Sequence, residues 1–339
     1  MAKILLVTNS PGQRGLAHYY YLALRDLVQE KNVKALFAKD ADYNTNRPFT
    51  RRLINKVESR FFNNYSKWQT NRIVDIVDKN EMTHVVLFNS AGLEPDDIIK
   101  LSKLPKIKLY QYLSDSPSGM SSEKFKNSIP TLKYFEAVFV YAKSLIPVIY
   151  QYGASKVFHL PFGYCKYTHL KAQPNSKTQH QGIYYFGTWG PLIEDWLSPL
   201  ATFGLKIEGN SWDRSKFAYL KSAAQKGGIV EGGMSEKAAQ AAIVVNFIRA
   251  QHGCFNSMKT FELAAAGACV ITNRTEEQID YFEDMKEIVY FDSQQDMLLK
   301  VEHLLNNEAL QAAIRTNAYN KVQKHSYHER ATMLIALID

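Results

Sequence analysis

Two short apolar runs on either side of a small helical segment constrain the fold of this chain most. The first run, residues 241–245, leads into Asn246, and the second covers residues 268–272. Between them lie a polar loop and a short apolar segment that Gly267 can end as a helix C-cap. Continuous apolar runs joined by a helix are typical of buried parallel strands. The chain is therefore expected to be an α/β protein with parallel sheets.

The loop before this helical segment places polar side chains at the carboxyl end of a strand, where open α/β sheets bind ligands. Asn256 or Ser257 can cap the helix. The N–H groups and partial positive charge at its N-terminus suit a phosphate. Lys259 lies one turn inside, and Glu262 follows among apolar residues, where a carboxylate must face solvent or have a partner. The pattern predicts an anion site.

The order Phe261-Glu262, then residues 264–267 (AAAG), then residues 270–272 (VIT) resembles the donor-site signature of the GT-B glycosyltransferases. The resemblance is strongest to their CgeB-like group. It implies that Glu262 holds the ribose of a nucleotide sugar and that Lys259 serves the diphosphate. It also implies that the glycine loop with Gly187 and Thr188 faces the diphosphate across from Lys259. Further segments resemble the family at residues 160–163, 283–292 and 325–330.

One position departs from that family. Many retaining relatives carry a second glutamate eight residues before the ribose glutamate, and here that position is Cys254. Asn256, His252 or a backbone N–H are the candidates to contact the donor sugar instead. The resemblance implies a retaining, metal-independent transfer with no cofactor besides the nucleotide-sugar substrate. Catalysis then consists mainly of stabilising the leaving diphosphate, for which Lys259 and Arg249 are suited.

The first half of the chain predicts a doubly wound parallel domain. A glycine loop with Gly12 and Gly15 follows the first apolar run, and it either cradles an acceptor or serves only the turn. His18 lies in the first turn of the next helix and is either a base or acceptor contact, or a packed or solvated side chain. Asp115, after the fourth run, is a catalytic cleft residue or an Asx-turn acceptor. The predicted strands are residues 3–8, 34–39, 83–88, 106–113, 137–141 and 156–160.

A polar stretch separates this domain from a second α/β pattern. The fold expected is two doubly wound, Rossmann-like domains facing a cleft. In the second domain we also predict a short strand at residues 229–230 and a helix at residues 276–285. The expected parts are an acceptor-side domain (1–165), a linker (166–181), a nucleotide-sugar-binding domain (182–318) and a C-terminal helix (319–339) packing back toward the first domain.

The basic charge is concentrated in the first half. Residues 1–165 hold 23 Lys and Arg against 14 Asp and Glu, a net +9, so the remainder carries −1 of the total +8. Residues 47–72 hold seven of these cations with five aromatic side chains interleaved. This segment is either a face that meets an anionic membrane surface, or an ordinary amphipathic segment with its aromatics inward.

Composition narrows the function classes. The chain is 46% hydrophobic, as globular proteins are, and no apolar run reaches the roughly 20 residues of a membrane-spanning helix. No signal-peptide layout is present, and the three cysteines lack metal-site spacing. These features predict a cytoplasmic protein, peripheral at the inner membrane face if the basic segment binds lipid. No P-loop, dinucleotide or nucleic-acid recognition motif occurs, so no nucleic-acid partner is expected.

We therefore expect a glycosyltransferase that moves a sugar from a nucleotide-diphosphate sugar to a glycan, lipid-linked or protein acceptor. Two alternatives stay open. A nucleotide-sugar epimerase of the same fold would need acidic and histidine residues around the sugar. A non-catalytic protein that only binds sugar nucleotides or assembles surface structures is favoured by Cys254 at the glutamate position.

Overall fold

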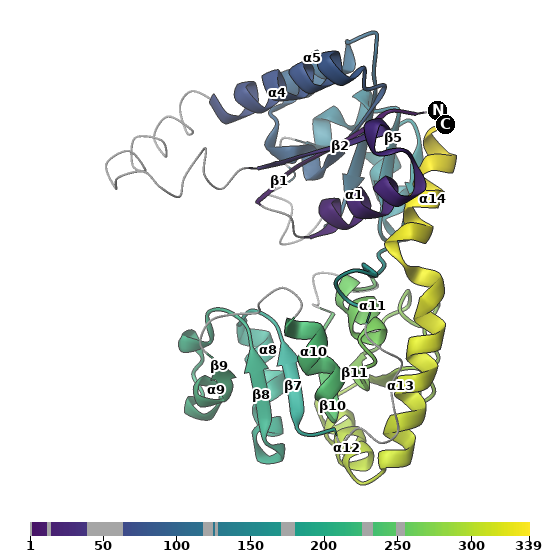
Figure 1. Ribbon diagram of the computed structural model, residues 1–339. Helices are drawn as coiled ribbons and strands as arrows, with labels where there is room; N and C mark the ends of the chain where they lie inside the picture. The colour runs from purple at the N-terminus through teal and green to yellow at the C-terminus, as the bar shows by residue number, and fades with distance from the viewer. Residues whose placement is uncertain are drawn as a thin grey trace. The chain divides into compact units, whose positions relative to one another are not determined.

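The computed structural model describes residues 2–11, 15–38, 64–117, 125, 128–170, 180–225, 233–248 and 255–339. The chain forms two compact units (Figure 1). The first unit comprises Met1–Pro161 and His328–Asp339, and the second comprises Phe162–Tyr327. The division therefore falls four residues before the expected domain end at residue 165. Of the expected linker, residues 171–179 lie outside the described part of the chain.

The first unit is built on a six-stranded parallel sheet in the order β2-β1-β3-β4-β5-β6. The strand order reverses between β1 and β3, which makes this the topological switch point of the sheet. Every residue of β3 and β5 is buried, as expected of parallel strands covered on both faces. The strands are β1 (Ile4–Pro11), β2 (Val33–Ala38), β3 (His84–Phe88), β4 (Lys108–Leu113), β5 (Ala137–Val140) and β6 (Val157–His159).

Helices cover this sheet, with α1 on one side and α4 and α5 on the other (Figure 1). Tyr20 of α1 is fully buried and lies 5.7 Å from the Tyr112 ring of β4, measured between ring centroids. The connections also contain the 3-10 segments η1 (Glu30–Asn32), η2 (Asn89–Gly92) and η4 (Ile129–Tyr134). The helices are α1 (Leu16–Leu27), α4 (Asn64–Asn80), α5 (Pro95–Ser102), α7 (Leu145–Gln151) and α14 (Tyr327–Ile338).

The C-terminal helix α14 packs within the first unit. His328 Nε2 lies 2.6 Å from a carboxylate oxygen of Asp26 on α1, and the Tyr110 hydroxyl donates to the Ile338 carbonyl at 3.4 Å. The continuous helix expected at residues 319–339 is instead broken, because residues 325–327 pair with the backbone of Tyr164. Tyr164 N–H donates to the His325 carbonyl, and Tyr327 N–H donates to the Tyr164 carbonyl.

The second unit has its own six-stranded parallel sheet in the order β12-β11-β10-β7-β8-β9. Its strand order reverses between β7 and β10. The strand predicted at residues 229–230 lies outside the described residues. The strand that pairs with β8 is β9, at Ala224–Gln225, before the predicted position. The strands are β7 (Ile183–Phe186), β8 (Leu205–Glu208), β9 (Ala224–Gln225), β10 (Ile243–Asn246), β11 (Val270–Asn273) and β12 (Val289–Phe291).

Six α-helices of the described second unit flank this sheet. Two of them begin at side-chain caps: the Ser293 hydroxyl accepts from Asp296 N–H, and the Asn307 amide oxygen accepts from Leu310 N–H. The second unit also contains the short 3-10 segments η5 (Ser198–Phe203), η6 (Trp212–Arg214) and η8 (Gln323–His325). The helices are α8 (Pro191–Leu197), α9 (Ala218–Ala223), α10 (Gly233–Gln240), α11 (Met258–Ala265), α12 (Gln294–Leu305) and α13 (Glu308–Val322).

A buried arginine of α13 donates hydrogen bonds to backbone carbonyls just after α10, just before β10 and just after α11. Arg315 is only 1% exposed. Its guanidinium donates to the carbonyls of Ala241 and Ala242 at 2.6 Å and of Gly267 at 3.2 Å. Burial lowers the pKa of Arg315, and the carbonyl dipoles at the ends of α10 and α11 offset part of that desolvation. The side chain thus fixes the start of β10 relative to the end of α11.

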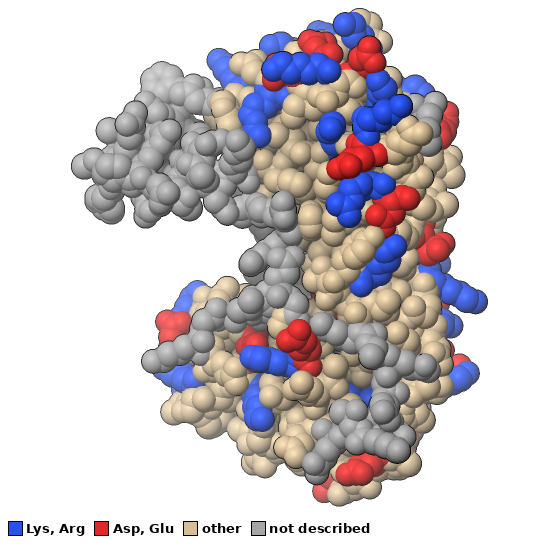
Figure 2. Space-filling view, viewed as in Figure 1, with Lys and Arg blue, Asp and Glu red and all other residues tan. Residues whose placement is uncertain are grey.

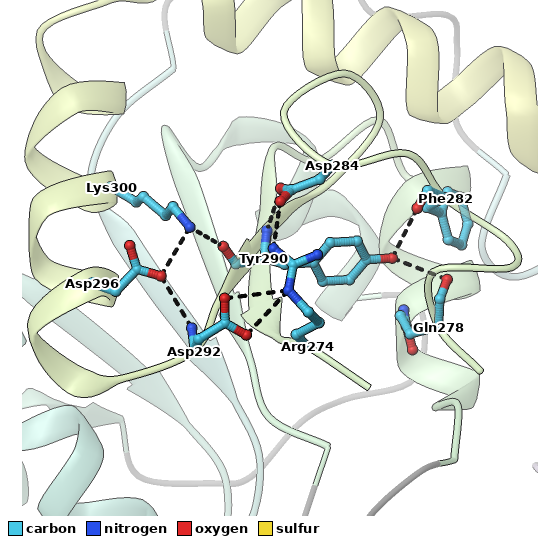
Figure 3. Close-up of polar contacts among 8 residues, drawn as sticks. All are labelled: Arg274, Gln278, Phe282, Asp284, Tyr290, Asp292, Asp296 and Lys300. Atoms are coloured by element: carbon cyan, nitrogen blue, oxygen red, sulfur yellow. Dashed lines mark hydrogen bonds and ion pairs between the residues drawn. The ribbon is translucent and has the colours of Figure 1, made fainter. Parts of the chain in front are cut away.

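The helix predicted at residues 276–285 is wrong, because the structure has a series of turns there. Tertiary contacts replace the helical hydrogen bonds (Figure 3). The buried Tyr290 hydroxyl lies 3.0 Å from the carbonyl oxygens of both Gln278 and Phe282, and its proton is donated to this pair. Burial raises the pKa of Tyr290, so the hydroxyl stays a donor at any physiological pH.

Candidate functional site

A pocket of about 330 Å³ lies at the switch point of the second unit. Its walls come from the chain that follows β7, β8 and β10 and from the first turn of α11. In open α/β sheets this is the position where ligands bind. Its volume is within the usual range of small-molecule pockets, roughly 300–1,000 Å³. The described lining residues are Tyr185, Gly187, Thr188, Gly209, Asn210, Phe247 and Lys259.

Two glycines bring the turns after β7 and β8 into backbone contact. A Cβ on Gly209 would overlap the Gly187 carbonyl group, and a Cβ on Gly187 would lie 2.8 Å from Cζ of Tyr185. The Gly187 carbonyl accepts from the Trp212 indole at 2.8 Å, and the Gly187 N–H donates to the Glu208 carbonyl at 2.8 Å. These contacts hold the backbone of the two turns along one wall of the pocket.

Lys259 supplies the positive charge of this pocket. Its ammonium donates to the carbonyl of Phe186, the last residue of β7. This hydrogen bond draws the side chain from α11 across to the glycine turn that begins at Gly187. Every other described lining residue is uncharged. The pocket therefore combines one cation with polar backbone and the hydroxyl-bearing residue Thr188, an arrangement suited to an anion.

Glu262 lies one turn further along α11 and is not among the described lining residues. It is 5% exposed, and Oε1 lies 3.5 Å from Nε2 of His169. Nδ1 of that imidazole accepts from the Cys165 N–H at 3.0 Å, which places the proton on Nε2, facing the carboxylate. The partner that sequence reasoning required for Glu262 is thus His169, which it did not identify because the two are far apart in the sequence.

The remaining donor-side predictions have different surroundings. Asn256 is buried, and its amide donates to the Glu277 carboxylate at 3.2 Å. Ser257 stands at the N-cap of α11 in an extended conformation, without a side-chain capping hydrogen bond. Arg249 and His252, together with Cys254, lie outside the described residues. Of the predicted donor residues, the structure therefore brings Gly187, Thr188 and Lys259 together at one pocket.

Asn273, which sequence reasoning missed, holds the chain that leaves β10. Its Oδ1 accepts from the Ile248 N–H at 2.7 Å, and its Nδ2 donates to the Ile248 carbonyl at 3.0 Å. This two-way clamp fixes the position of Phe247 on the pocket wall. An asparagine directly after an apolar strand run is the only sequence signal that could have singled it out.

A smaller crevice of about 50 Å³ occupies the switch point of the first unit. The Asn89 amide donates to the Ser114 hydroxyl at 2.7 Å and lies 3.5 Å from Oδ2 of Asp115. Its oxygen accepts from the Ser114 N–H at 2.9 Å. Asn89, Ser90 and Ala91 all have left-handed backbones, with φ of 48°, 60° and 53°. The described lining residues are Thr8, Asn9, Ser10, Leu16, Ala17, Phe88, Asn89 and Ser114.

Of the described residues predicted to serve the acceptor, only Asp115 is shown beside this crevice. Asp115 lies beside the crevice through its contact with Asn89. His18 is not among the described lining residues, and its ring packs against Phe37 at 5.7 Å between centroids. Gly15 precedes α1 with a φ of 81°, which explains a glycine there by geometry. Gly12 lies outside the described residues.

Most of the basic segment at residues 47–72 also falls outside the described part, including Arg51, Arg52, Lys56 and Arg60. On the face drawn in Figure 2, the cations of the first unit are interspersed with acidic side chains. Within the described ranges, no helix is long and apolar enough to cross a membrane. Nor do three or more His, Cys, Asp or Glu side chains gather there as metal ligands. Membrane association of the segment stays a prediction.

Comparison with known proteins adds to this geometry. Residues 191–336 match the family described as "Glycosyl transferase-like". Among solved structures, Anabaena HepE in complex with UDP-glucose is similar at a TM-score of 0.66 and 11% identity, covering 100% of both chains. A sucrose-phosphate synthase from Thermosynechococcus elongatus is similar at a TM-score of 0.65 and 12% sequence identity. The match covers 99% of this chain and 98% of that one.

A glycosyltransferase from Rickettsia africae is similar at a TM-score of 0.61 and 14% identity, covering 99% of this chain and 97% of that one. No curated protein matches the sequence. At these identities the likeness establishes the fold, which is that of the GT-B glycosyltransferases. The chain thus has the GT-B α/β architecture, and its residues 191–336 match a glycosyl transferase-like family.

Proposed function

We propose that this protein is a glycosyltransferase that takes its sugar from a nucleotide-diphosphate sugar. The observation that carries the proposal is the pocket at the β7/β10 switch point, where the Lys259 ammonium and the backbone of two glycine turns border one space. The glycosyl transferase-like match covers the helix that carries Lys259. HepE, which shares the fold, was crystallised with UDP-glucose, and this supports the same class of donor here.

The diphosphate is the part of the donor that this pocket suits best. An ammonium and backbone N–H groups at the start of α11 attract phosphate oxygens, and hydrogen bonds to an ionised group are stronger than neutral ones. During transfer the bond between the sugar C1 and the diphosphate oxygen breaks, and negative charge grows on that oxygen. Lys259 offsets this growing charge. For this reason we propose a transfer that proceeds without a metal ion and, by the family resemblance, with retention at C1.

The first unit is proposed to hold the acceptor, whose hydroxyl oxygen forms the new bond to C1 and loses its proton. The amide of Asn89 and the hydroxyl of Ser114 suit a neutral, hydroxylated ligand such as a glycan or the sugar of a lipid-linked acceptor. Asp115, beside them, is the carboxylate that can accept the proton. Glu262 is proposed to bind the ribose, with His169 keeping its carboxylate in one orientation.

The epimerase alternative fits the pocket less well. Epimerisation needs acidic and histidine side chains around the sugar. The described lining residues of the second-unit pocket include neither an acid nor a histidine. Leaving-group stabilisation by a lysine, in contrast, is what a transferase requires.

A thermal-shift series with UDP, GDP, ADP and their sugar conjugates tests the proposal directly. A ligand present at 100 times its Kd stabilises the native state by about 2.7 kcal/mol, which a melting curve resolves easily. We expect one nucleotide series to raise Tm, and incubation of its sugar conjugate with glycan acceptors to release the nucleoside diphosphate. If no nucleotide or nucleotide sugar shifted Tm, the donor pocket would be wrongly assigned. An epimer formed without acceptor would favour the epimerase.

A further inference from the structure

A second pocket of the second unit, of about 360 Å³, shares no described lining residue with the candidate nucleotide pocket. It lies between the turn that precedes β12 and one face at the end of α13. We call it the lysine pocket. Its described lining residues are Lys286, Glu287, Asn317, Asn320, Lys321 and Lys324.

Helical spacing explains why four of these side chains share one face. Asn317, Asn320, Lys321 and Lys324 recur three and four positions apart along α13 and the η8 segment that continues it. The opposite face is buried, with residues such as Ala318 fully inaccessible. Two amides and two ammonium groups therefore stand side by side on the polar face, and Lys286 contributes a third ammonium from the turn.

The pocket has an excess of positive charge. Three ammonium groups line it against one carboxylate, that of Glu287, a net charge of +2 for the lining. The Glu287 carboxylate is largely buried, already accepts the Glu283 N–H at 2.8 Å, and lies 3.8 Å from the Lys321 ammonium. The Lys286–Glu283 pair joins side chains that are 56% and 63% exposed, and such pairs contribute little. An incoming anion can therefore recruit Lys286 at small cost.

The turn that presents Lys286 is held in place from both ends (Figure 3). The Asp284 carboxylate accepts from the Arg274 guanidinium at 2.6 Å and from the Tyr290 N–H at 3.0 Å. The hydrogen bond to Asp284 raises the pKa of Arg274, so its charge is permanent. On the other side, the Asn317 amide donates to the Lys286 carbonyl at 3.1 Å. Prior ordering of the turn lowers the entropy lost when a ligand binds.

We propose that the lysine pocket binds a phosphate group attached to a hydroxylated body. Ammonium groups bind phosphate as point charges, and three of them around a net +2 lining suit either a dianionic phosphate monoester or a monoanionic phosphodiester. The amides of Asn317 and Asn320 can donate to or accept from neighbouring hydroxyls. The source of the phosphate is either a soluble sugar or polyol phosphate, or the glycerophosphate headgroup of a lipid. The site does not depend on the proposed transferase activity.

Lysine acetylation rates, read by mass spectrometry, test this site residue by residue. The arms are sodium chloride, glycerol 3-phosphate at matched ionic strength, and vesicles of phosphatidylcholine with or without phosphatidylglycerol. We expect glycerol 3-phosphate or the anionic vesicles to slow acetylation of Lys286, Lys321 and Lys324 at least threefold relative to chloride. Protection by glycerol 3-phosphate identifies a soluble ligand, and protection by anionic vesicles alone identifies a headgroup. Lys79, in the last turn of α4, is the matched control and should react at one rate throughout.

Two variants complete the test. Lys321→Ala combined with Lys324→Ala should abolish the protection of Lys286 while leaving Tm within about 1 °C, because both side chains are exposed. Lys259→Ala, which alters the other pocket, should keep the protection unchanged. The proposal is overturned if Lys321 and Lys324 react in every arm as they do in chloride, if Lys79 is protected equally, or if the double variant protects Lys286 as the wild type does.

Discussion

Both units reverse their strand order once, between β1 and β3 in the first and between β7 and β10 in the second. At the first switch point the crevice is about 50 Å³, and the described lining consists of amides, hydroxyls and apolar groups. At the second it is about 330 Å³, and Lys259 adds a positive charge. Sheet topology alone therefore places a crevice in each unit, while the residues of the loops decide its chemistry. We propose on this basis a neutral hydroxylated ligand for the first crevice and an anion for the second.

The two crevices also differ in how their turns are made. The second unit uses Gly187 and Gly209 where a Cβ would overlap neighbouring backbone or an aromatic ring. The first unit instead places three non-glycine residues, 89–91, in left-handed conformations. Each such residue costs on the order of 1 kcal/mol, which the surrounding contacts must offset. The hydrogen bonds of Asn89 to Ser114 and of Gln111 to Ser90 are part of that compensation.

The largest effect is expected from a substitution that pushes apart the two backbone turns that form a wall of the second crevice. Gly209→Ala forces a Cβ onto the Gly187 carbonyl group, and because backbone cannot yield as a flexible side chain does, we expect a loss of about 3 kcal/mol in the free energy of unfolding. Nucleotide binding should disappear with it. Urea unfolding and calorimetry measure both.

Gly190→Ala is the matched control for that variant. Gly190 has an extended backbone, and the nearest atom to its added Cβ is 3.9 Å away. Its effect should stay within about 0.5 kcal/mol. Equal effects of the two substitutions would show that the close approach of the two turns does not shape the pocket.

Removing the charge tests the difference between the crevices most directly. Lys259→Ala should lower kcat about 100-fold while weakening nucleoside binding far less, because the charge it offsets grows in the transition state. Activity should survive EDTA. Steady-state kinetics and calorimetry separate the two effects. Complete loss on chelation, restored by Mg²⁺ or Mn²⁺, would refute the proposed metal independence.

Glu262 is expected to matter through its charge rather than its shape. Glu262→Gln keeps the side-chain volume but removes the carboxylate that faces His169, and we expect nucleotide binding to weaken about tenfold. Calorimetry gives the affinity and a melting curve the stability. A lower Tm with unchanged affinity would instead make the buried Glu262–His169 pair purely structural.

A substitution in the first crevice is expected to change the kinetics of the acceptor and to leave the affinity for the donor unchanged. Asn89→Ala removes the amide that contacts Ser114 and Asp115, so we expect KM for the acceptor to rise several-fold with donor affinity unchanged. Initial rates at varied acceptor and fixed saturating donor decide this. A change in donor affinity of the same size would contradict the division of roles between the units.

The smallest effect concerns pH. Burial lowers the pKa of His84 in the first unit and of His180 in the second, and the charges of Lys108 and Arg315 act in the same direction. The unfolded chain therefore takes up protons first, near the ordinary histidine pKa of about 6.5, and stability falls as the pH drops below that value. Urea unfolding from pH 8 to 5 should show this loss. His84→Gln and His180→Gln should each flatten it, and an unchanged slope in either would assign the effect elsewhere.

The positions of the strands were predictable because buried parallel strands are continuous apolar runs, a property that each segment carries locally. Strands β3 and β5 differ from the predicted limits of residues 83–88 and 137–141 by one residue each. The turns at residues 276–285 were not predictable in this way. Their polar and apolar residues are spaced as in a helix, but Tyr290 and Arg274, outside the segment, supply the hydrogen bonds that decide its path.

The sequence by itself determined an α/β chain with two parallel sheets, a glycine turn after residue 186 and a lysine in the helix that follows a polar loop. Only the tertiary structure decided the strand orders, and with them the places where Gly187, Gly209, Phe247 and Lys259 meet. The same holds for the Glu262–His169 pair, which joins residues far apart in the chain. Apolar runs and turn residues act on their immediate neighbours. Strand order and pocket walls instead depend on which distant segments pack together, and this is settled by the free energy of the whole fold.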